Sequence, residues 1–211
     1  RVRNTNTLSY DFRKLISNDN HHLNVLLGQE YIITEQRTFN TWVDGLPDFY
    51  TAEQAWAFMG AGSNASSSNM NYAADDILLS YFGRINYDFK GKYMLSATMR
   101  GDGSSKFSKG QKWGYFPSVA ASWRLSDEWG MKDLRWLDNL KLKASIGSQG
   151  NDNIGNFRYT NTYTIENANG KVSTVFNAKG SENITWETNS NFNAGVEFSF
   201  LRGTVSGGVE Y

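Results

Sequence analysis

Cysteine is absent from this chain of 211 residues, and proline occurs only twice. Without cysteine the chain has no disulfide framework, no thiol nucleophile and no Cys-based zinc site. It also lacks any run of about 18 apolar residues, which excludes a transmembrane helix. The opening stretch RVRNTNTLSYDF has neither a methionine nor an apolar segment. We therefore interpret it as a strand that continues a longer chain and not as a signal peptide.

Neither sign of charge is in excess, because 21 Lys and Arg residues balance 21 Asp and Glu residues. A nucleic-acid partner bound through bulk charge would need a basic excess, so we expect no such partner. Hydrophobic residues make up 39% of the chain and aromatic residues 15%, with 20 glycines. This composition indicates a β-rich chain with many polar loops.

Alternation of apolar and polar residues is the dominant pattern of the sequence. It is clearest in runs that begin at Leu79, Tyr93, Tyr115, Leu140 and Phe192, and it returns in a last run from Thr204 to Tyr211. Such alternation predicts strands with one apolar and one polar face. Two earlier runs, at residues 2–12 and 23–33, follow it less cleanly. We predict an all-β fold of roughly eight to ten strands, nearly all antiparallel.

The connections between these runs are of two kinds. FKGK at residues 89–92 and LRGT at residues 201–204 have glycine where tight hairpin turns need a positive φ. Residues 102–112, 148–156 and about 39–75 are long and polar instead. Within the longest of these, Thr51 followed by Gln54 predicts the capped start of a short helix.

No catalytic constellation is present, so we expect no enzyme activity, no cofactor and no metal. His21 and His22 are adjacent at the start of a strand, and neighbouring side chains of a strand point to opposite faces. The stretch Asn151–Asn156 lacks the spaced acidic residues of a calcium loop, and an Asx-type turn is favoured there.

Aromatic residues in the longest loop are the only hint of a binding site. Trp42, Tyr50 and Trp56 lie there together with Phe49 and Phe58. Aromatic rings stack on the apolar faces of sugars or pack against peptide side chains. The same residues are also suited to forming a small core of the loop itself, and the sequence leaves both interpretations open.

Two architectures fit the alternation: a soluble β-sandwich and a transmembrane β-barrel. The barrel is favoured because aromatic residues gather at strand ends, as in interfacial girdles, and because short turns alternate with long loops. Charges in the middle of the polar face suit a wet or plugged lumen. In lipid an open sheet edge is forbidden, so the strands would have to belong to a closed barrel.

Four blocks of the sequence carry a resemblance to a known family. They read RINYDFKGKYMLSATMRGDGSSKF, WGYFPSVAASWRLSDEWGM, LDNLKLKASIGSQGNDNIGNF and ITWETNSNFNAGVEFSFLRGTVSGGVEY, and they span about residues 79–211. In this order they closely resemble the barrel of SusC/RagA-type TonB-dependent transporters. Residues 1–78 resemble an upstream barrel section with a variable loop. The whole stretch 1–211 resembles a middle section of a larger barrel, without the plug domain or the TonB-contacting motif.

The resemblance implies a protein of the bacterial outer membrane that imports glycan fragments or peptides. It also implies energy from TonB, acting through a plug region outside this chain, and a SusD-like lipoprotein over the extracellular mouth. A complete small outer-membrane barrel with a structural or adhesin role and a soluble carbohydrate-binding β-sandwich remain as alternatives.

Parity assigns each side chain to a face of the predicted wall. We expect Tyr87, Leu95, Val119, Leu142, Val196 and Val209 to face lipid, and Arg84, Arg100, Ser122, Lys141, Lys143 and Glu197 to face the lumen. The two tight turns are expected on the periplasmic side, and residues 39–75, 104–111 and 151–156 on the extracellular side. Residues 157–178 form either two further membrane strands or a hairpin within one outer loop.

Overall fold

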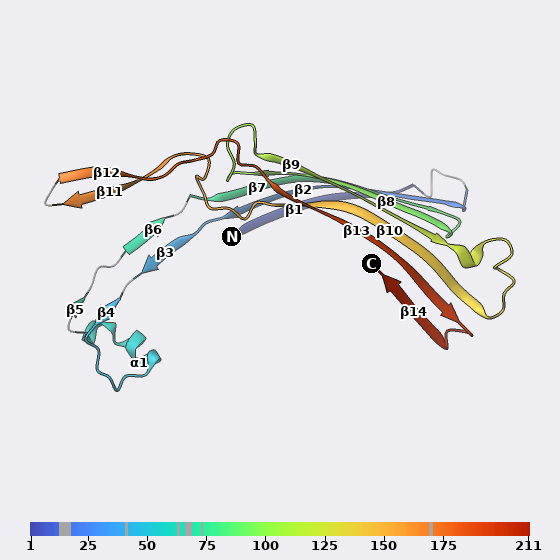
Figure 1. The fold of residues 1–211 in the computed structure, drawn as a ribbon, viewed down its shortest axis with the longest axis horizontal. Coiled ribbons are helices and arrows are strands. Elements are labelled where there is room, and N and C mark those ends of the chain that lie inside the picture. Colours follow the sequence, from blue (N-terminus) through green and yellow to red (C-terminus); the bar gives the residue numbers. More distant parts are fainter. Residues whose placement is uncertain (13–17, 41, 63, 66–68, 73, 169–170) are drawn as a thin grey trace. The chain divides into compact units, whose positions relative to one another are not determined.

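The structure is a computed structural model that describes residues 1–12, 18–40, 42–62, 64–65, 69–72, 74–168 and 171–211 (Figure 1). Almost all regular structure in it is β, as predicted. The strands are β1 (Val2–Asp11), β2 (His21–Thr34), β3 (Arg37–Asn40), β4 (Val43–Asp44), β5 (Asn64–Ala65), β6 (Asn69–Tyr72), β7 (Asp76–Phe89), β8 (Tyr93–Ser104), β9 (Trp113–Arg124), β10 (Leu137–Asn151), β11 (Thr162–Ala168), β12 (Lys171–Ala178), β13 (Glu187–Phe200) and β14 (Val205–Glu210). The helical elements are α1 (Ala52–Ala57), η2 (Met59–Ala61) and η3 (Leu125–Asp127). No helix in the described ranges has the length and apolar content needed to cross a membrane.

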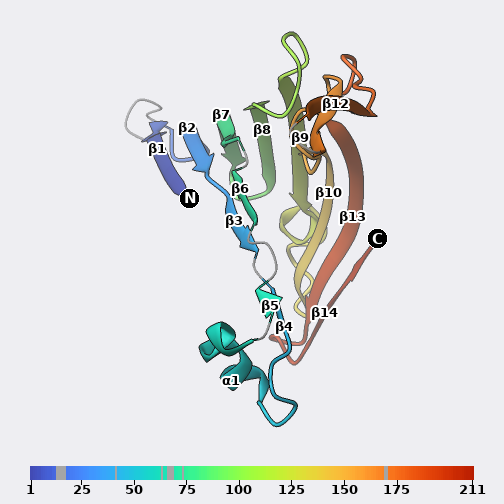
Figure 2. The same ribbon diagram turned by 90° about the vertical axis from the view of Figure 1, so that its left-hand side faces the viewer.

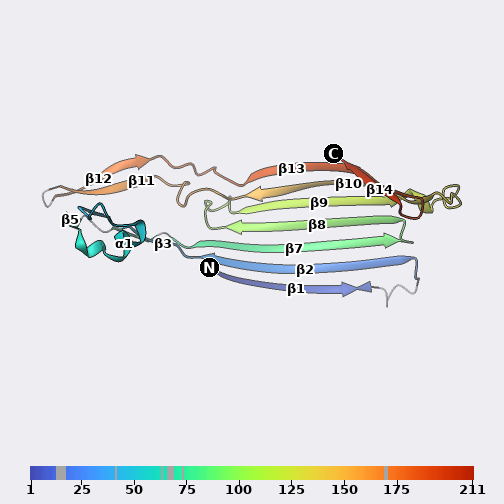
Figure 3. The same cartoon turned by 90° about the horizontal axis from the view of Figure 1, so that it is seen from below.

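The described chain divides into two compact units, of which residues 2–33 and 76–211 form the larger. This unit contains an eight-stranded sheet in the order β1-β2-β7-β8-β9-β10-β13-β14, with its strands lying side by side in Figure 3. Every strand pair with a described register in this sheet is antiparallel. The prediction of an antiparallel barrel segment of roughly eight to ten strands is confirmed, with eight strands in this sheet.

Residues 157–178 do not add strands to this sheet. β11 and β12 pair only with each other within the described structure, and β10 pairs directly with β13 as far as Asn151 opposite Glu187. Of the two possibilities that the sequence leaves open, the structure has the hairpin inside a long connection, with both of its strands labelled in Figure 3 and β12 labelled in Figure 2.

Both predicted hairpin turns are present, and both need left-handed backbone. Lys90 and Gly91 have φ values of 57° and 67°, and Leu201, Arg202 and Gly203 have values of 55°, 58° and 80°. Consecutive positive φ values give the backbone twist that matches two strands joined by a tight turn. The up-and-down order then brings both tight turns and the β9–β10 connection to one end of the sheet, the short-turn end, and the β8–β9 and β10–β13 connections to the other, the long-connection end.

Residues opposite each other in the register form rows that cross the sheet with one chemical character. One row runs from Phe89 through Tyr93, Trp123, Leu142 and Val196 to Val209. Another, in the middle of the strands, contains Ile85, Ala97, Val119, Ile146 and Phe192. The alternate residues make polar rows, such as Asn86, Ser96, Ala120, Ser145 and Asn193. The predicted parity therefore holds across strands as well as along them.

The apolar face is the exposed one. Val119 is 44% exposed, Ile146 59% and Tyr115 64%, whereas Ser80, Asp102 and Ser104 are buried. A soluble sandwich would cover its apolar face with a second sheet, and no such sheet occurs in the described structure. This inversion is the arrangement of a wall that presents its apolar side to lipid.

Aromatic side chains mark both ends of the apolar face. Tyr81 stacks on Trp113 near the long connections, with ring centroids 6.2 Å apart, and Tyr93 stacks on Trp123 near the short turns at 6.1 Å. Ten residues separate Trp113 from Trp123 along β9, which is about 34 Å of strand. At a tilt of about 40° this corresponds to roughly 26 Å along the membrane normal, close to the apolar band of outer-membrane barrels.

The second unit comprises residues 34–75 together with Arg1. It contains the strand pairs β3–β6 and β4–β5 and the short helix α1. The predicted capping box is present: the Gln54 N–H donates to Thr51 Oγ1 at 3.3 Å, and the Thr51 N–H donates to Gln54 Oε1 at 2.9 Å.

Candidate functional site

The polar face carries a cluster of charged groups centred on Arg100 of β8. Its guanidinium donates to Asp102 at 2.8 Å and to Ser80 Oγ at 2.9 Å, and it pairs with Glu30 of β2 at 3.2 Å. The same group lies 5.5 Å from the centroid of the Phe82 ring. Arg100 therefore joins β2, β7 and β8 on the face that the sequence assigns to the lumen.

Glu30 is the most buried charge of this cluster, with only 4% of its surface exposed. Its carboxylate accepts hydrogen bonds from Arg3 Nε at 2.6 Å and from Thr5 Oγ1 at 3.1 Å, in addition to the pairing with Arg100. A buried carboxylate is tolerated when cations and donors surround it in this way. The cluster thus extends the connection to β1, the strand at the end of the sheet order.

A second charged group lies near the short turns. Lys143 of β10 reaches Glu197 at 2.9 Å and Glu210 at 2.8 Å, joining β10, β13 and β14. Lys141 lies opposite both Arg124 and Glu197 in the register. Arg84 is more exposed, and its Nε donates to Thr98 Oγ1 at 3.1 Å. Five charged residues were predicted to face the lumen. Arg100 lies in the first group, Lys143 and Glu197 form the second with Lys141 beside them, and Arg84 contacts Thr98 instead.

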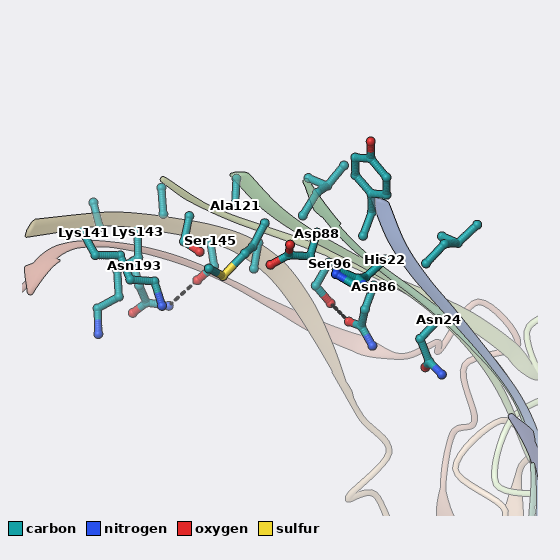
Figure 4. Close-up of a pocket in the computed structure, with 18 of the residues that line it drawn as sticks. His22, Asn24, Asn86, Asp88, Ser96, Ala121, Lys141, Lys143, Ser145 and Asn193 are labelled. Atoms are coloured by element: carbon teal, nitrogen blue, oxygen red, sulfur yellow. Dashed lines mark hydrogen bonds between the residues drawn. The ribbon is translucent and has the colours of Figure 1, made fainter. Parts of the chain in front are cut away.

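Beside the second group the polar face is hollowed into a cavity of about 540 Å³, which is lined in part by Lys141, Lys143 and Glu210 and is shown in Figure 4. Asn86 accepts from Ser96 at 2.8 Å and Asn193 donates to Ser145 at 3.4 Å, so neutral polar side chains form part of its lining. Asp88 and Lys141 add charges of opposite sign to the same lining. Such a lining offers hydrogen bonds and weak charge complementarity, and suits polar contacts better than bond-breaking chemistry.

An aromatic cluster at the long-connection end was not predicted from the sequence. Phe107 is fully buried, its ring centroid lies 5.3 Å from that of Trp186, and Phe116 lies 5.4 Å from Trp186. A Cβ at Gly150 would overlap the Phe116 ring, so this contact requires glycine. Phe116 is the one large apolar residue on the polar parity of β9, which is the signal that could have revealed the cluster.

Hydrogen bonds also join the β8–β9 connection to the β10–β13 connection, from which Phe107 and Trp186 of this cluster come. The Trp186 indole donates to the Lys112 carbonyl at 2.9 Å, and Ser108 Oγ donates to the Glu182 carbonyl at 2.7 Å. Ser104 Oγ also donates to Asp152 at 2.8 Å. The β8–β9 and β10–β13 connections therefore form one body. The Asx turn expected near Asn151 is present, because the Asn153 N–H donates to Asn151 Oδ1 at 2.9 Å.

The loop aromatics are only partly brought together. Tyr50 packs against Phe49 and Phe58, with ring centroids 5.2 and 5.9 Å apart, as expected for a small core of the loop. Trp42 and Trp56 are 52% and 80% exposed. Tyr50 is therefore partly structural, while the two tryptophans present apolar surface.

These features define a class of protein: a section of transmembrane β-barrel wall, with an exposed apolar face, aromatic residues at both ends and cross-linked charges on the other face. Comparison with known proteins gives the family. The family model described as TonB dependent receptor-like, beta-barrel, matches residues 1–211, and the chain belongs to this family.

Individual relatives are of the same kind. The chain is 40% identical over 147 residues to TonB-dependent receptor SusC of Bacteroides thetaiotaomicron, covering 66% of this chain and 15% of that protein. It is 30% identical over 218 residues to TonB-dependent receptor P3 of Formosa agariphila, covering 98% and 21%. Among solved structures, the RagAB peptide importer in its closed-closed state matches with a TM-score of 0.82 and 26% identity, covering 99% of this chain and 22% of that one. The chain thus spans about a fifth of the length of such relatives.

Proposed function

We propose that this chain is part of the wall of an outer-membrane importer for glycan fragments or peptides, with the polar face toward the lumen. The observation that carries this proposal is the inversion of the sheet, whose apolar face is exposed while charged groups are cross-linked on the other. Membership in the TonB-dependent receptor family supports import as the function. Arg84, Arg100, Lys141, Lys143 and Glu197 are then lumen residues.

The partners follow from the same family relationship. A TonB-dependent receptor takes its energy from TonB, and the similarity to SusC and to the RagAB importer supports a SusD-like lipoprotein as a partner. The long connections, including residues 39–75, would face the cell exterior. Exposed Trp42 and Trp56, together with Tyr50, would contact the substrate there, because flat rings pack against sugars and peptide side chains alike.

Growth of the source bacterium tests this proposal. A strain lacking the full-length gene should lose growth on either oligosaccharides or peptides as the limiting nutrient, and the intact gene should restore it. Trp56→Ala in the full-length protein should slow uptake of that nutrient. Leu201→Ala, which removes an exposed apolar side chain from the tight turn at residues 201–204, should not. Unchanged growth of the deletion strain on both nutrient classes would refute import as the function.

Orientation of the wall needs its own measurement. Single cysteines at Ser122 and at Val119 would be treated with a charged thiol reagent in vesicles that contain the full-length protein. Ser122→Cys should react and Val119→Cys should not, because only the former faces water in this proposal. Equal reaction at both positions would contradict the assignment of the faces.

A further inference from the structure

The connection between β9 and β10 is tied to the apolar face of the sheet. Glu128 accepts hydrogen bonds from Tyr93 Oη at 2.6 Å and from Trp123 Nε1 at 3.1 Å, both on the same carboxylate oxygen. Tyr93 and Trp123 belong to the apolar row nearest the short turns. Lys92 adds an ion pair with Glu128 at 3.5 Å. The connection therefore begins over the lipid-facing side and is not directed toward the polar face.

The same connection is held by backbone hydrogen bonds although it contains little regular structure. Backbone hydrogen bonds close four successive turns, from the N–H groups of residues 128, 131, 134 and 137 to the carbonyls three residues earlier, at 2.9 to 3.1 Å. Its far end is held as well, because the Trp136 carbonyl accepts from the Leu201 N–H at 2.9 Å and its ring lies 5.6 Å from that of Phe200. The backbone of this segment is therefore already ordered, which reduces the entropy cost of holding one of its side chains at a surface.

Trp129 is a side chain of this segment, and it is 99% exposed. It follows Glu128 directly and precedes Gly130, whose φ of 89° turns the chain. A fully exposed tryptophan gains none of the free energy that burial of its large ring in an apolar environment would provide. At the membrane interface the ring is covered by the acyl boundary while its N–H stays hydrated, which is why tryptophan gathers there.

Cations complete the match to a phospholipid surface. Lys90 and Lys92 lie in the β7–β8 turn beside the Tyr93–Trp123 pair, and Lys90 Nζ lies 5.1 Å from the centroid of the Phe89 ring. Lipid phosphates attract such lysines, and their stems cover apolar surface while the ammonium groups stay in water. Aromatic rings and cations at one level of the wall are the chemistry of a headgroup boundary.

We propose that the β9–β10 connection is a membrane-interface anchor, in which the Glu128 latch holds Trp129 against the headgroup region of the leaflet on the short-turn side. The occupant of this surface is phospholipid. The argument from continuity is that the anchor extends the row of Phe89, Tyr93 and Trp123, which already faces lipid. This inference rests on the orientation of the wall and is independent of what is imported.

The test uses the full-length protein in vesicles of phosphatidylethanolamine and phosphatidylglycerol, with any other cysteines replaced by serine. An environment-sensitive fluorophore on Trp129→Cys should emit at shorter wavelength than the same label on Lys109→Cys, which lies in the β8–β9 connection at the opposite end. Quenchers attached at the lipid headgroup should quench the label at position 129 strongly, quenchers deep in the acyl chain weakly, and iodide in water hardly at all. The label at position 109 should show the reverse preference for iodide.

The latch is tested in the same background with Glu128→Leu, which removes the acceptor, and with the double variant Tyr93→Phe and Trp123→Phe, which keeps aromatic rings but removes both donors. Both should expose the label at position 129 to iodide, while heat-dependent gel mobility shows that the barrel is folded. Two results would overturn the proposal: free access of iodide to position 129 in unmodified vesicles, or shielding from iodide without any quenching from lipid, which would mean that a protein covers this surface. Lipid quenching unchanged by the latch variants would overturn the role of Glu128.

Discussion

Placing an arginine on each face of one strand tests the orientation of the sheet most directly. Val119 lies in β9 six residues from Trp113 and four from Trp123, so it is near the middle of the band between the two aromatic ends. Its cross-strand neighbours are Ala97 and Ile146, both apolar. Val119→Arg would place a guanidinium in hydrocarbon, where neither neighbour can donate or accept a hydrogen bond.

The expected cost is about 2–4 kcal/mol, the range for a charge on the lipid face of a barrel near the midplane. This corresponds to roughly a 30- to 700-fold change in the unfolding equilibrium, since each 1.4 kcal/mol is a factor of ten. Ala120→Arg is the matched control. It puts the same side chain one residue away on the opposite face, where Ser96 and Ser145 are its neighbours and the cavity of about 540 Å³ leaves room.

Urea unfolding of the full-length protein in phospholipid vesicles, followed by the gel-mobility difference between folded and unfolded barrels, measures both variants. The Val119→Arg midpoint should fall well below that of the unmodified protein, and the Ala120→Arg midpoint should change little. A control that is destabilised as strongly as Val119→Arg, or more strongly, would refute the assignment of the apolar face to lipid.

Three further predictions follow from the charged groups and the connections. Arg100→Met should lower stability by about 2–3 kcal/mol in the same assay, somewhat below the 3–5 kcal/mol typical of a fully buried pair because the arginine is partly exposed, whereas Arg84→Met should cost about 1 kcal/mol or less; equal losses would contradict the network. Hydrogen bonds from a tyrosine and a tryptophan, with a nearby lysine, hold the pKa of Glu128 below its ordinary value of about 4.5. The stabilising contribution of Glu128 should be complete above pH 4.5 and lost as the pH falls through the lowered pKa. Lipid quenching of a label at position 129 should therefore persist from pH 7 to 5 and decline in more acidic buffer. In Glu128→Gln this pH dependence should disappear. Trypsin added to intact cells should cut at Lys109 in a long connection and spare Arg202 in a tight turn, and cleavage only at Arg202 would reverse the proposed sidedness.

Much of the wall could be predicted from the sequence because its strands and turns are determined by residues that are close together in the chain. Alternation with a period of two fixes which residues share a face, and glycine at positions 91 and 203 fixes where the hairpins turn. The capping box at Thr51 was likewise readable, because both of its partners lie within one turn of helix. These features need no knowledge of which strands are neighbours.

What the sequence did not show depends on contacts between distant segments. Glu30 and Arg100 are 70 positions apart, and the sequence pattern around Glu30 was too irregular to place it on the buried polar face. Trp186 meets Phe107 only because the β10–β13 connection folds back over the β8–β9 connection. The Glu128 latch was missed for the same reason, since its tyrosine donor lies 35 positions earlier.

Because β10 pairs directly with β13, the pairing of the wall strands does not depend on the residues that connect them. Residues 152–186 leave the wall after Asn151 and return at Glu187, its cross-strand partner, so the register of the strands is independent of the length between them. The β11–β12 hairpin within that stretch can therefore be shortened, lengthened or exchanged while the paired strands on either side keep their partners. Members of the family can in this way differ in an insert without any change to the apolar face of the sheet.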